Sequence, residues 1–393
     1  MQANRLIFIL LLLVSFTVKA ELPVLSDQSK VILFTCTPGD ELYAGFGHSA
    51  LWISDPSLGL DRLYNYGTFD FNTPNFYSKF VRGKLDYMLT VTTARRFISE
   101  YEYRKIGVTG QTLKLNLTER QKLLDLVETN LLPENRFYKY DFFYDNCATR
   151  IRDLVVKAVD GEVDFNTPDK NISFREILFP YLKYTPWTKF GINLILGLTS
   201  DKIASPNDYM YMPELMQEEF AAALIIKGDD KYPLMEKEQQ FLKSKLIFEY
   251  NLLHDPALFF SGLFLIIGLM TFYELHSGRY YKWLDIVLNG IGVLAGLFLF
   301  FMWVGTDHSA TNQNLNSLWL FPAQTVFLSS LFLKKKWRKK LAMISFTIIV
   351  TVSFAMHIWP QASEISFLII SLIYALRYLF HNRLALKQDE LAK

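Results

Sequence analysis

Five apolar runs in the C-terminal third of the chain constrain its fold more than any other feature of the sequence. They extend approximately over residues 257–273, 283–303, 318–333, 341–359 and 365–380. Each has about 16 to 21 residues, close to the roughly 20 that an α-helix needs to cross the hydrocarbon core of a membrane. The third run is short and contains Pro322, which predicts a kink or a start inside the membrane interface. The sequence therefore predicts a five-helix transmembrane unit over residues 255–382.

The loops between these runs alternate in charge, and this alternation predicts their orientation. The loop before the second run has two basic residues, the segment Lys334–Lys340 has six, and the tail over 383–393 has three. The loops after the second and fourth runs contain neither Lys nor Arg. Because basic loops remain in the cytoplasm, we expect a multi-pass membrane protein with a cytoplasmic C-terminal tail. The same rule places Asp307 and His308 outside, together with the residues that precede the first run.

Ionisable residues are rare within the apolar runs. Arg377 and His357 lie near the ends of their runs, and we expect these side chains to reach toward water by snorkelling. Transporters usually carry ionisable groups or pairs of broken helices within the membrane. The composition of the runs therefore favours an anchor or a platform for lipid access over a pump.

The N-terminal sequence MQANRLIFILLLLVSFTVKA has the organisation of an export signal. Arg5 precedes an apolar core over residues 6–14, and Val18-Lys19-Ala20 offers small residues at the spacing that a signal peptidase accepts. We expect residues 1–20 to be a signal peptide that is cleaved after Ala20, with an uncleaved anchor as the alternative. In both cases the residues that follow lie outside the cytoplasm. The net charge of +2 gives no reason to expect nucleic acid as a partner.

Residues 21–250 have the pattern of an α+β domain with a small, mostly antiparallel sheet and flanking helices. The stretches VILFTCT, SALWIS, DRLYNYG and LDYMLTVTT predict strands. A capping box that begins at Thr118 predicts a helix to about Leu132, with Leu123, Leu124 and Val127 on its inner face. The aromatic stretch before Cys147 predicts a strand that leads into a second helix, with Ile151, Leu154, Val155 and Ala158 inward. We assign residues 21–160 to this unit and 161–250 to a helical extension that covers it.

Cys147 and His48 are the residues that best fit a catalytic role. Asn146 and Asp145 are favourable N-cap residues, so Cys147 is expected in the first turn of a helix, where the macrodipole favours a thiolate. His48 follows a Gly-Phe-Gly turn and leads into a strand. A histidine on a sheet that faces a cysteine at a helix start is an arrangement for Cys–His nucleophilic catalysis.

Structural roles for the same residues remain open at this level. Cys147 can be a small core residue, or it can form a disulfide with Cys36, the only other cysteine. Asn65 can orient the imidazole of His48, and Arg150 can bind a phosphate head group or simply lie on a solvated helix face. The spacing of His and Cys predicts no metal site, and the chain has neither a phosphate-binding glycine loop nor a Gly-x-Ser-x-Gly motif.

Several long motifs resemble a known family. The runs CTPGDELYAGFGHSALWI, YNYGTFDFNTPNFYSKFVRG and PENRFYKYDFFYDNCATRIRD resemble the N-terminal periplasmic domain of Lnb-type lipoprotein N-acyltransferases. TDHSATNQNLNSLWLFP resembles the outer loop of the transmembrane unit of that family. This resemblance implies a permuted papain-like cysteine-enzyme fold, in which the strand of His48 precedes the helix of Cys147. It also implies a bacterial inner (cytoplasmic) membrane location with the N-terminal domain in the periplasm.

The resemblance further implies a mechanism that needs no cofactor. His48 takes the proton of Cys147, the thiolate attacks an ester of a phospholipid acyl donor, and the resulting thioester acylates the N-terminal amine of a diacylated lipoprotein. Asp307 and His308 can close over this site or belong to a purely structural loop. A periplasmic cysteine hydrolase, such as a cell-wall amidase or a lipase, and a non-catalytic membrane assembly module are the alternatives.

Overall fold

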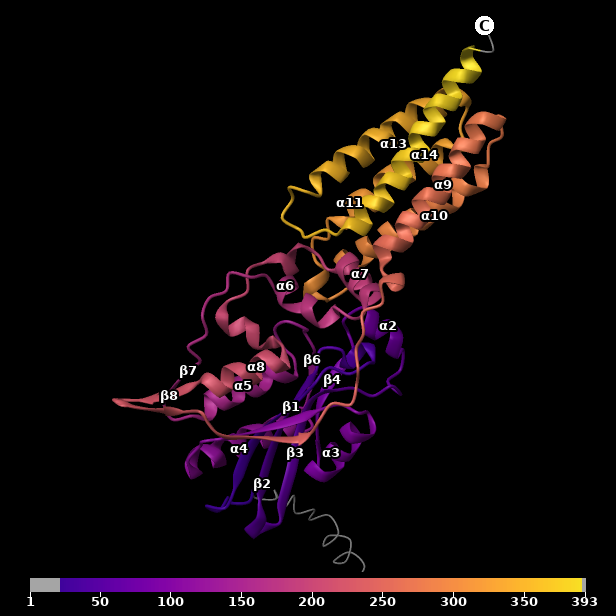
Figure 1. Ribbon diagram of the computed structural model, residues 1–393. Helices are drawn as coiled ribbons and strands as arrows, with labels where there is room; N and C mark the ends of the chain where they lie inside the picture. The colour runs from indigo at the N-terminus through magenta and orange to yellow at the C-terminus, as the bar shows by residue number, and fades with distance from the viewer. Residues whose placement is uncertain (1–21, 391–393) are drawn as a thin grey trace, which may run out of the picture.

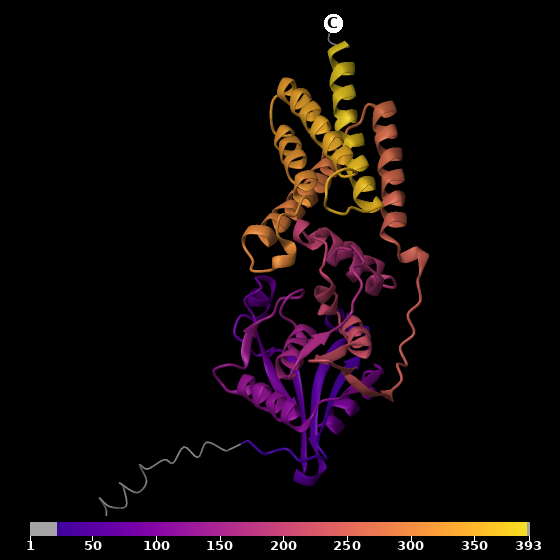
Figure 2. The same ribbon diagram turned by 90° about the vertical axis from the view of Figure 1, so that its left-hand side faces the viewer.

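The computed structural model describes residues 22–390, so the predicted signal peptide over 1–20 lies outside the described residues (Figure 1). An N-terminal domain built from a sheet and helices is followed by a helical region that begins at Pro256. Figure 2 shows the two parts stacked end to end, with the C-terminus at the far end of the helical region. The predicted α+β class of the N-terminal domain is confirmed.

A seven-stranded antiparallel sheet forms the centre of the N-terminal domain. Its strand order is β10-β5-β1-β2-β3-β4-β6, and each neighbouring pair is antiparallel. The four stretches predicted as strands correspond to β1 to β4. The strands are β1 (Lys30–Cys36), β2 (His48–Asp55), β3 (Leu60–Thr68), β4 (Asp86–Thr92), β5 (Val108–Leu113), β6 (Phe137–Lys139) and β10 (Met235–Leu242).

Helices cover both faces of this sheet, because successive side chains of a strand point to opposite sides. Val31 and Leu33 of β1 pack into a core with α4, α5 and α8, whereas Ile32 and Phe34 pack on the other face with α3. The helices are α3 (Ala94–Tyr103), α4 (Leu117–Leu131), α5 (Cys147–Ala158) and α8 (Pro213–Ala222); the short α2 (Phe76–Val81) follows β3. The inner faces predicted for α4 and α5 are buried as expected.

Two local predictions in this domain are wrong. The N-cap of α4 is Asn116 rather than Thr118, because the Asn116 side chain accepts the Glu119 N–H while Thr118 is already helical. The aromatic stretch before Cys147 is a turn rather than a strand, since Asp141 and Asp145 exchange two backbone hydrogen bonds of 3.1 and 3.0 Å that close it.

The extension over 161–250 is less helical than predicted. It contains α6 (Phe174–Leu178), α7 (Pro186–Ile195) and α8, but also a three-stranded sheet of β7 (Glu162–Asp164), β8 (Leu224–Lys227) and β9 (Asp230–Pro233). Its last strand, β10, returns to the edge of the main sheet beside β5. The extension is therefore joined to the main sheet of the N-terminal domain through β10.

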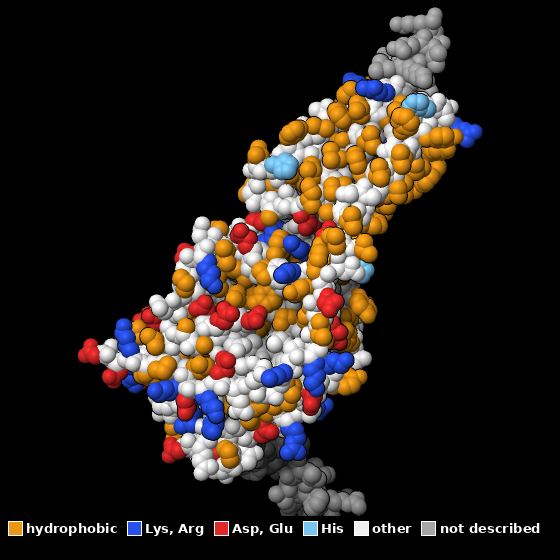
Figure 3. Space-filling model, in the orientation of Figure 1, with side chains coloured by type: hydrophobic (Ala, Val, Ile, Leu, Met, Phe, Trp, Pro, Cys, Tyr) orange, Lys and Arg blue, Asp and Glu red, His pale blue; other side chains and the backbone are white. Residues whose placement is uncertain are grey.

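The helical region contains six helices where five spans were predicted. They are α9 (Pro256–Ser277), α10 (Lys282–Val304), α11 (Asn316–Leu320), α12 (Pro322–Ser330), α13 (Lys335–Ala355) and α14 (Ile365–Glu390). Within the described residues, three segments are long and apolar enough to cross a membrane: Pro256–Ser277, Lys282–Val304 and Ile365–Arg383. Helix α12 begins at Pro322, one residue beyond the end of α11, and most of the basic run over 334–340 lies in the first turns of α13 rather than in a loop. Figure 3 shows hydrophobic side chains spread over the surface of this region.

The expectation that Arg377 snorkels toward water is wrong. Its side chain is fully buried, because α9 and α10 supply two carboxylates that reach its guanidinium. Arg377 forms ion pairs with Glu274 of α9 and Asp285 of α10, and His381 also contacts the Asp285 carboxylate at 2.6 Å. A buried charge is tolerated when it is paired in this way, so the cluster fixes three helices against one another.

One contact between the N-terminal domain and the helical region involves the backbone of Gly197 and of the 3-10 helix η4 (Leu198–Asp201) that follows it. Gly197 N–H donates to Ala310 O at 2.9 Å, and Leu198 N–H donates to Gln313 O at 3.3 Å. A Cβ atom on Gly197 would lie only 1.9 Å from Asn312 O. Only glycine therefore permits this close approach of the two backbones.

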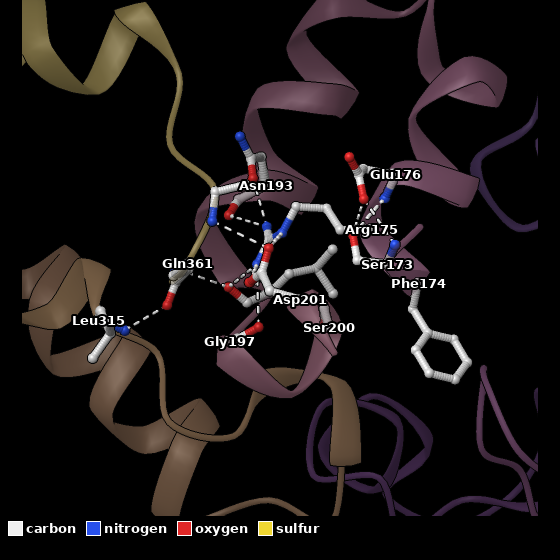
Figure 4. Close-up of polar contacts among 12 residues, drawn as sticks. Ser173, Phe174, Arg175, Glu176, Asn193, Gly197, Ser200, Asp201, Leu315 and Gln361 are labelled. Atoms are coloured by element: carbon white, nitrogen blue, oxygen red, sulfur yellow. Dashed lines mark hydrogen bonds and ion pairs between the residues drawn. The ribbon is translucent and has the colours of Figure 1, made fainter. Parts of the chain in front are cut away.

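A buried arginine organises the same junction (Figure 4). Arg175 is 0% exposed; its guanidinium makes two hydrogen bonds of 2.8 Å to the Asp201 carboxylate and one of 2.5 Å to the Asn193 amide oxygen. Gln361, from the loop between α13 and α14, donates to Leu196 O and accepts the Leu315 N–H. The two outer loops of the helical region are thus tied to the N-terminal domain.

Candidate active site

The start of helix α5 is held by the side chain of Asn146. Its Oδ1 accepts the N–H groups of Ala148 and Thr149 at 2.8 and 3.0 Å, and its carbonyl oxygen accepts the Arg150 N–H at 3.1 Å. The N–H groups of a first helical turn have no carbonyl partner within the helix; the Asn146 side chain satisfies those of Ala148 and Thr149 and does not engage the N–H of Cys147. The cap therefore places Cys147 at the first position of the helix, where its own N–H can donate to a ligand. The residue is 6% exposed.

The sheet opens where Cys147 approaches it. The pairing of β1 with β2 continues to Cys36 and His48, but the pairing of β2 with β3 stops at Leu51 and Tyr64. In this opening the Ser49 N–H turns toward the sulfur of Cys147. Gly67 of β3, at φ +84°, lies on the other side, where a Cβ would be 3.8 Å from that of Cys147. The first residue of α5, Cys147, thus lies in the gap between β2 and β3.

His48 lies between the thiol and an amide. Its Nε2 is 2.6 Å from Oδ1 of Asn65, and Cys147 is close enough to raise the pKa of its imidazole. Because Nε2 is used by Asn65, Nδ1 is the nitrogen left to exchange a proton with the thiol. The ring of Tyr101 stacks on the imidazole with an interplanar angle of 12°. The structure therefore brings three residues predicted from the sequence, Cys147, His48 and Asn65, together at one site, with His48 in the middle.

The electrostatics of this pair favour a thiolate beside an imidazolium. Burial raises the pKa of the Cys147 thiol, but the facing imidazole and the N–H groups of Ser49 and Ala148 outweigh it and lower that pKa below its usual value. Burial lowers the pKa of His48, yet Cys147 and the hydrogen bond to Asn65 raise it on balance. Each group stabilises the charge of the other, which is the condition for a nucleophilic sulfur.

Arg150 and Tyr138 lie one turn from the sulfur. Arg150 forms a bidentate ion pair with Asp145, at 2.5 and 2.7 Å, and its guanidinium carbon lies 3.6 Å from the ring centroid of Tyr138. Burial raises the pKa of Tyr138, so its phenol keeps its proton. Within the described residues this phenol has no hydrogen-bond partner. Its oxygen would lie 4.0 Å from a Cβ at Gly67, the residue that also borders Cys147.

Asp307 and His308 lie against a different segment of the domain. The Asp307 N–H donates to Arg82 O at 2.9 Å, and Nε2 of His308 donates to Phe80 O at 3.1 Å. The next residue, Ser309, donates through Oγ to the carboxylate of Asp141 at 2.5 Å. The outer loop is thus connected to the site by Ser309 and Asp141, two residues that sequence reasoning missed and that no sequence signal marks.

Cys36 and Cys147 are both free thiols, so the alternative of a disulfide between them is wrong. Cys36 is buried on the α3 face of the sheet, in the core that contains Phe97 and Tyr101. In residues 22–390, no group of three or more His, Cys, Asp or Glu side chains is placed to hold a metal ion.

Two protein-family models match the chain. The model described as the Lnb N-terminal periplasmic domain matches residues 24–179, and the model described as the Lnb transmembrane domain matches residues 248–389. Searches of the curated proteins and of the solved structures gave no match.

Proposed function

Since the chain belongs to the Lnb family of bacterial envelope membrane proteins, with a periplasmic N-terminal domain and a transmembrane domain, we propose that it is a lipoprotein N-acyltransferase. The arrangement of thiol, imidazole and amide at Cys147, His48 and Asn65 is the single observation that carries this proposal. The order of these residues, with the histidine strand before the cysteine helix, supports a permuted papain-like site.

The proposed topology has five crossings and a cytoplasmic C-terminus in the inner membrane. The three long apolar helices provide the first, second and fifth crossings, and α11 with α12 and then α13 provide the third and fourth. The basic residues at the start of α13 support a cytoplasmic position for that end. This arrangement puts the loop of Asp307, and the domain that contacts it, on the periplasmic side.

In the first step, Sγ of Cys147 attacks the carbonyl carbon of a phospholipid ester. A C–S bond forms, the ester C–O bond breaks, and the His48 imidazolium gives its proton to the departing lysophospholipid oxygen. In the second step, the free α-amine of a diacylated lipoprotein attacks the thioester. His48 accepts the amine proton, a C–N bond forms, and the C–S bond breaks to restore the thiolate.

Two donors are available for the oxyanion that develops in each step. The N–H of Cys147 is left over by the Asn146 cap, and the Tyr138 phenol holds a proton without an acceptor. Donors that are fixed before reaction stabilise such a charge without reorganisation. Arg150, stacked on the Tyr138 ring, makes the phenol a stronger donor, which is a role for Arg150 other than direct lipid binding.

Full-length protein in nanodiscs, supplied with a phospholipid of labelled acyl chain and a diacylated lipopeptide, tests the proposal. We expect N-acyl lipopeptide in stoichiometric amounts with lysophospholipid, and a hydroxylamine-sensitive label on Cys147 when the acceptor is omitted. Cys147→Ala should abolish both signals, whereas Cys36→Ser, the matched control for the other thiol, should retain them. Free fatty acid without N-acyl lipopeptide would instead identify a hydrolase, and an active Cys147→Ala variant would exclude thiol chemistry.

A further inference from the structure

The surface beside α2 exposes large aromatic side chains. We call the cluster of Phe69, Phe71, Phe76, Tyr77 and Phe80 the α2 aromatic patch. Phe71, Tyr77 and Phe80 are 64%, 79% and 47% exposed. Their rings pack on one another, with centroid distances of 4.9 Å between Phe71 and Phe76 and 5.0 Å between Phe69 and Phe71. A contiguous apolar patch of this kind on a water-facing domain indicates an interaction surface.

The patch lies at the level where the chain enters the membrane. Phe80 O accepts a hydrogen bond from His308, only a few residues after the last residue of α10, Val304. Arg82, at the end of α2, accepts the Asp307 N–H through its carbonyl oxygen. Figure 2 shows α2 directly below the outer loop of the helical region. Aromatic side chains at this depth are typical of the interface between lipid and water.

A continuous row of rings connects the patch with the nucleophile. Phe69 contacts Tyr87 at a centroid distance of 5.4 Å, and Tyr87 stacks on Tyr140 at 4.6 Å. Tyr140 and Cys147 then border the same residue, Gly67, whose absent side chain would lie 3.5 Å from Cε2 of Tyr140 and 3.8 Å from Cβ of Cys147. The row therefore leads from the membrane-facing surface to the carbon that carries the thiol.

We propose that the acyl chain of the phospholipid donor leaves the outer leaflet over the α2 aromatic patch and lies along Phe69, Tyr87 and Tyr140, with its ester at Cys147. This inference rests on the proposed function, because it names how the donor reaches that site. Flat apolar rings suit an acyl chain, which has no hydrogen-bonding groups of its own.

Photocrosslinking tests the route without requiring turnover. Full-length Cys147→Ala protein in nanodiscs is irradiated with a phosphatidylethanolamine that carries a diazirine in one acyl chain, and adducts are mapped by mass spectrometry. We expect adducts on residues 69–87 and on Tyr140, besides those on the lipid-exposed helices. Adducts confined to α9–α14 would overturn the proposal, as would adducts on α2 from an added diacylated lipopeptide but not from the phospholipid. If the wild type forms no thioester while these adducts persist, the proposed function fails and the lipid route remains.

Substitution of exposed rings provides a second test. The double variant Phe71→Ser/Tyr77→Ser removes two surface side chains, so we expect it to fold and to acylate Cys147 from bilayer phospholipid about tenfold more slowly. Tyr103→Ser is the matched control, because Tyr103 is 88% exposed on α3, outside the patch. Equal rates for the double variant and the wild type would overturn the proposal. A thermal melt of each protein shows whether a slower rate results from the missing rings or from a loss of folding.

Discussion

At the scale of single residues, the proposed mechanism requires the charge on His48 to control the reactivity of Cys147. The pKa of the thiol is lowered and that of the imidazole is raised, so a thiolate and an imidazolium coexist over a wider pH range than they would for two isolated groups. In His48→Ala the largest effects that lower the thiol's pKa are lost, and burial is opposed only by the N–H groups of Ser49 and Ala148. We expect alkylation of Cys147 by iodoacetamide at about pH 7 to slow at least tenfold, since each pKa unit changes the thiolate fraction about tenfold.

This measurement is made in a Cys36→Ser background, so that only one thiol reacts. With His48 present, the alkylation rate of Cys147 should begin to rise at a lower pH than the rate of an ordinary thiol. A His48→Ala profile that superimposes on the wild-type profile would show that the imidazole does not activate the sulfur.

A substitution of Tyr138 distinguishes a catalytic role of its phenol from a structural one. Its phenol has no partner in the described residues, so Tyr138→Phe should leave the melting temperature unchanged or slightly raised. Loss of an oxyanion donor should nevertheless lower kcat for acyl transfer by roughly 100-fold. The alkylation rate of Cys147, which develops no oxyanion, should not change. Unchanged kcat would remove Tyr138 from the mechanism.

At the scale of elements, we expect the N-cap of α5 to affect both the stability of the domain and the reactivity of Cys147. The Asn146 side chain is buried and also donates to the carbonyl oxygens of Phe142 and Tyr211. We expect Asn146→Ala to lower the free energy of unfolding by about 2 kcal/mol and to slow alkylation of Cys147. Asn116→Ala is the matched control, because Asn116 caps α4 through the same capping box but on an exposed surface. Asn116→Ala should lower the free energy of unfolding by about 1 kcal/mol and leave the alkylation rate of Cys147 unchanged.

The elements also show what local sequence could and could not predict. A short apolar run predicted β1, alternating patterns predicted β2 to β4, and the period of apolar residues predicted the inner faces of α4 and α5, because these patterns depend on neighbours in the chain. The pairing of β10 with β5 joins residues far apart in sequence, and its strand Met235–Leu242 is mostly polar and exposed. Nothing local distinguishes such an edge strand from a loop.

The site was predictable to a similar extent. His48 and Cys147 stand out because their residue types are scarce and their flanking glycines and cap residues are recognisable. Asn65 follows from its strand beside the histidine. Tyr138, Ser309 and Asp141 could not be identified, because their roles depend on the opening between β2 and β3 and on a loop that returns from a distant part of the chain.

At the scale of the whole molecule, the junction at Gly197 should control how the two parts are held together. In Gly197→Ala the new Cβ would collide with Asn312 O, so the outer loop must move. We expect a loss of roughly 1–3 kcal/mol in stability, measured as a lower melting temperature in detergent, and faster proteolysis near residue 312. Gly191→Ala is the matched control, because nothing lies within 4 Å of a Cβ at that position of α7. Equal melting curves for the two variants would contradict the close approach of the backbones.

In the proposed mechanism, the hydrogen bond between Ser309 and Asp141 helps to hold the sulfur of Cys147 at a constant distance from the lipid surface. An enzyme held in this way cannot swing outward to collect a partner from the aqueous space. Both reactants proposed above are themselves anchored by hydrocarbon chains in the same leaflet, so each meets the sulfur by lateral diffusion. The collision rate then depends on the number of reactants per unit of membrane area rather than on concentration in the periplasmic volume.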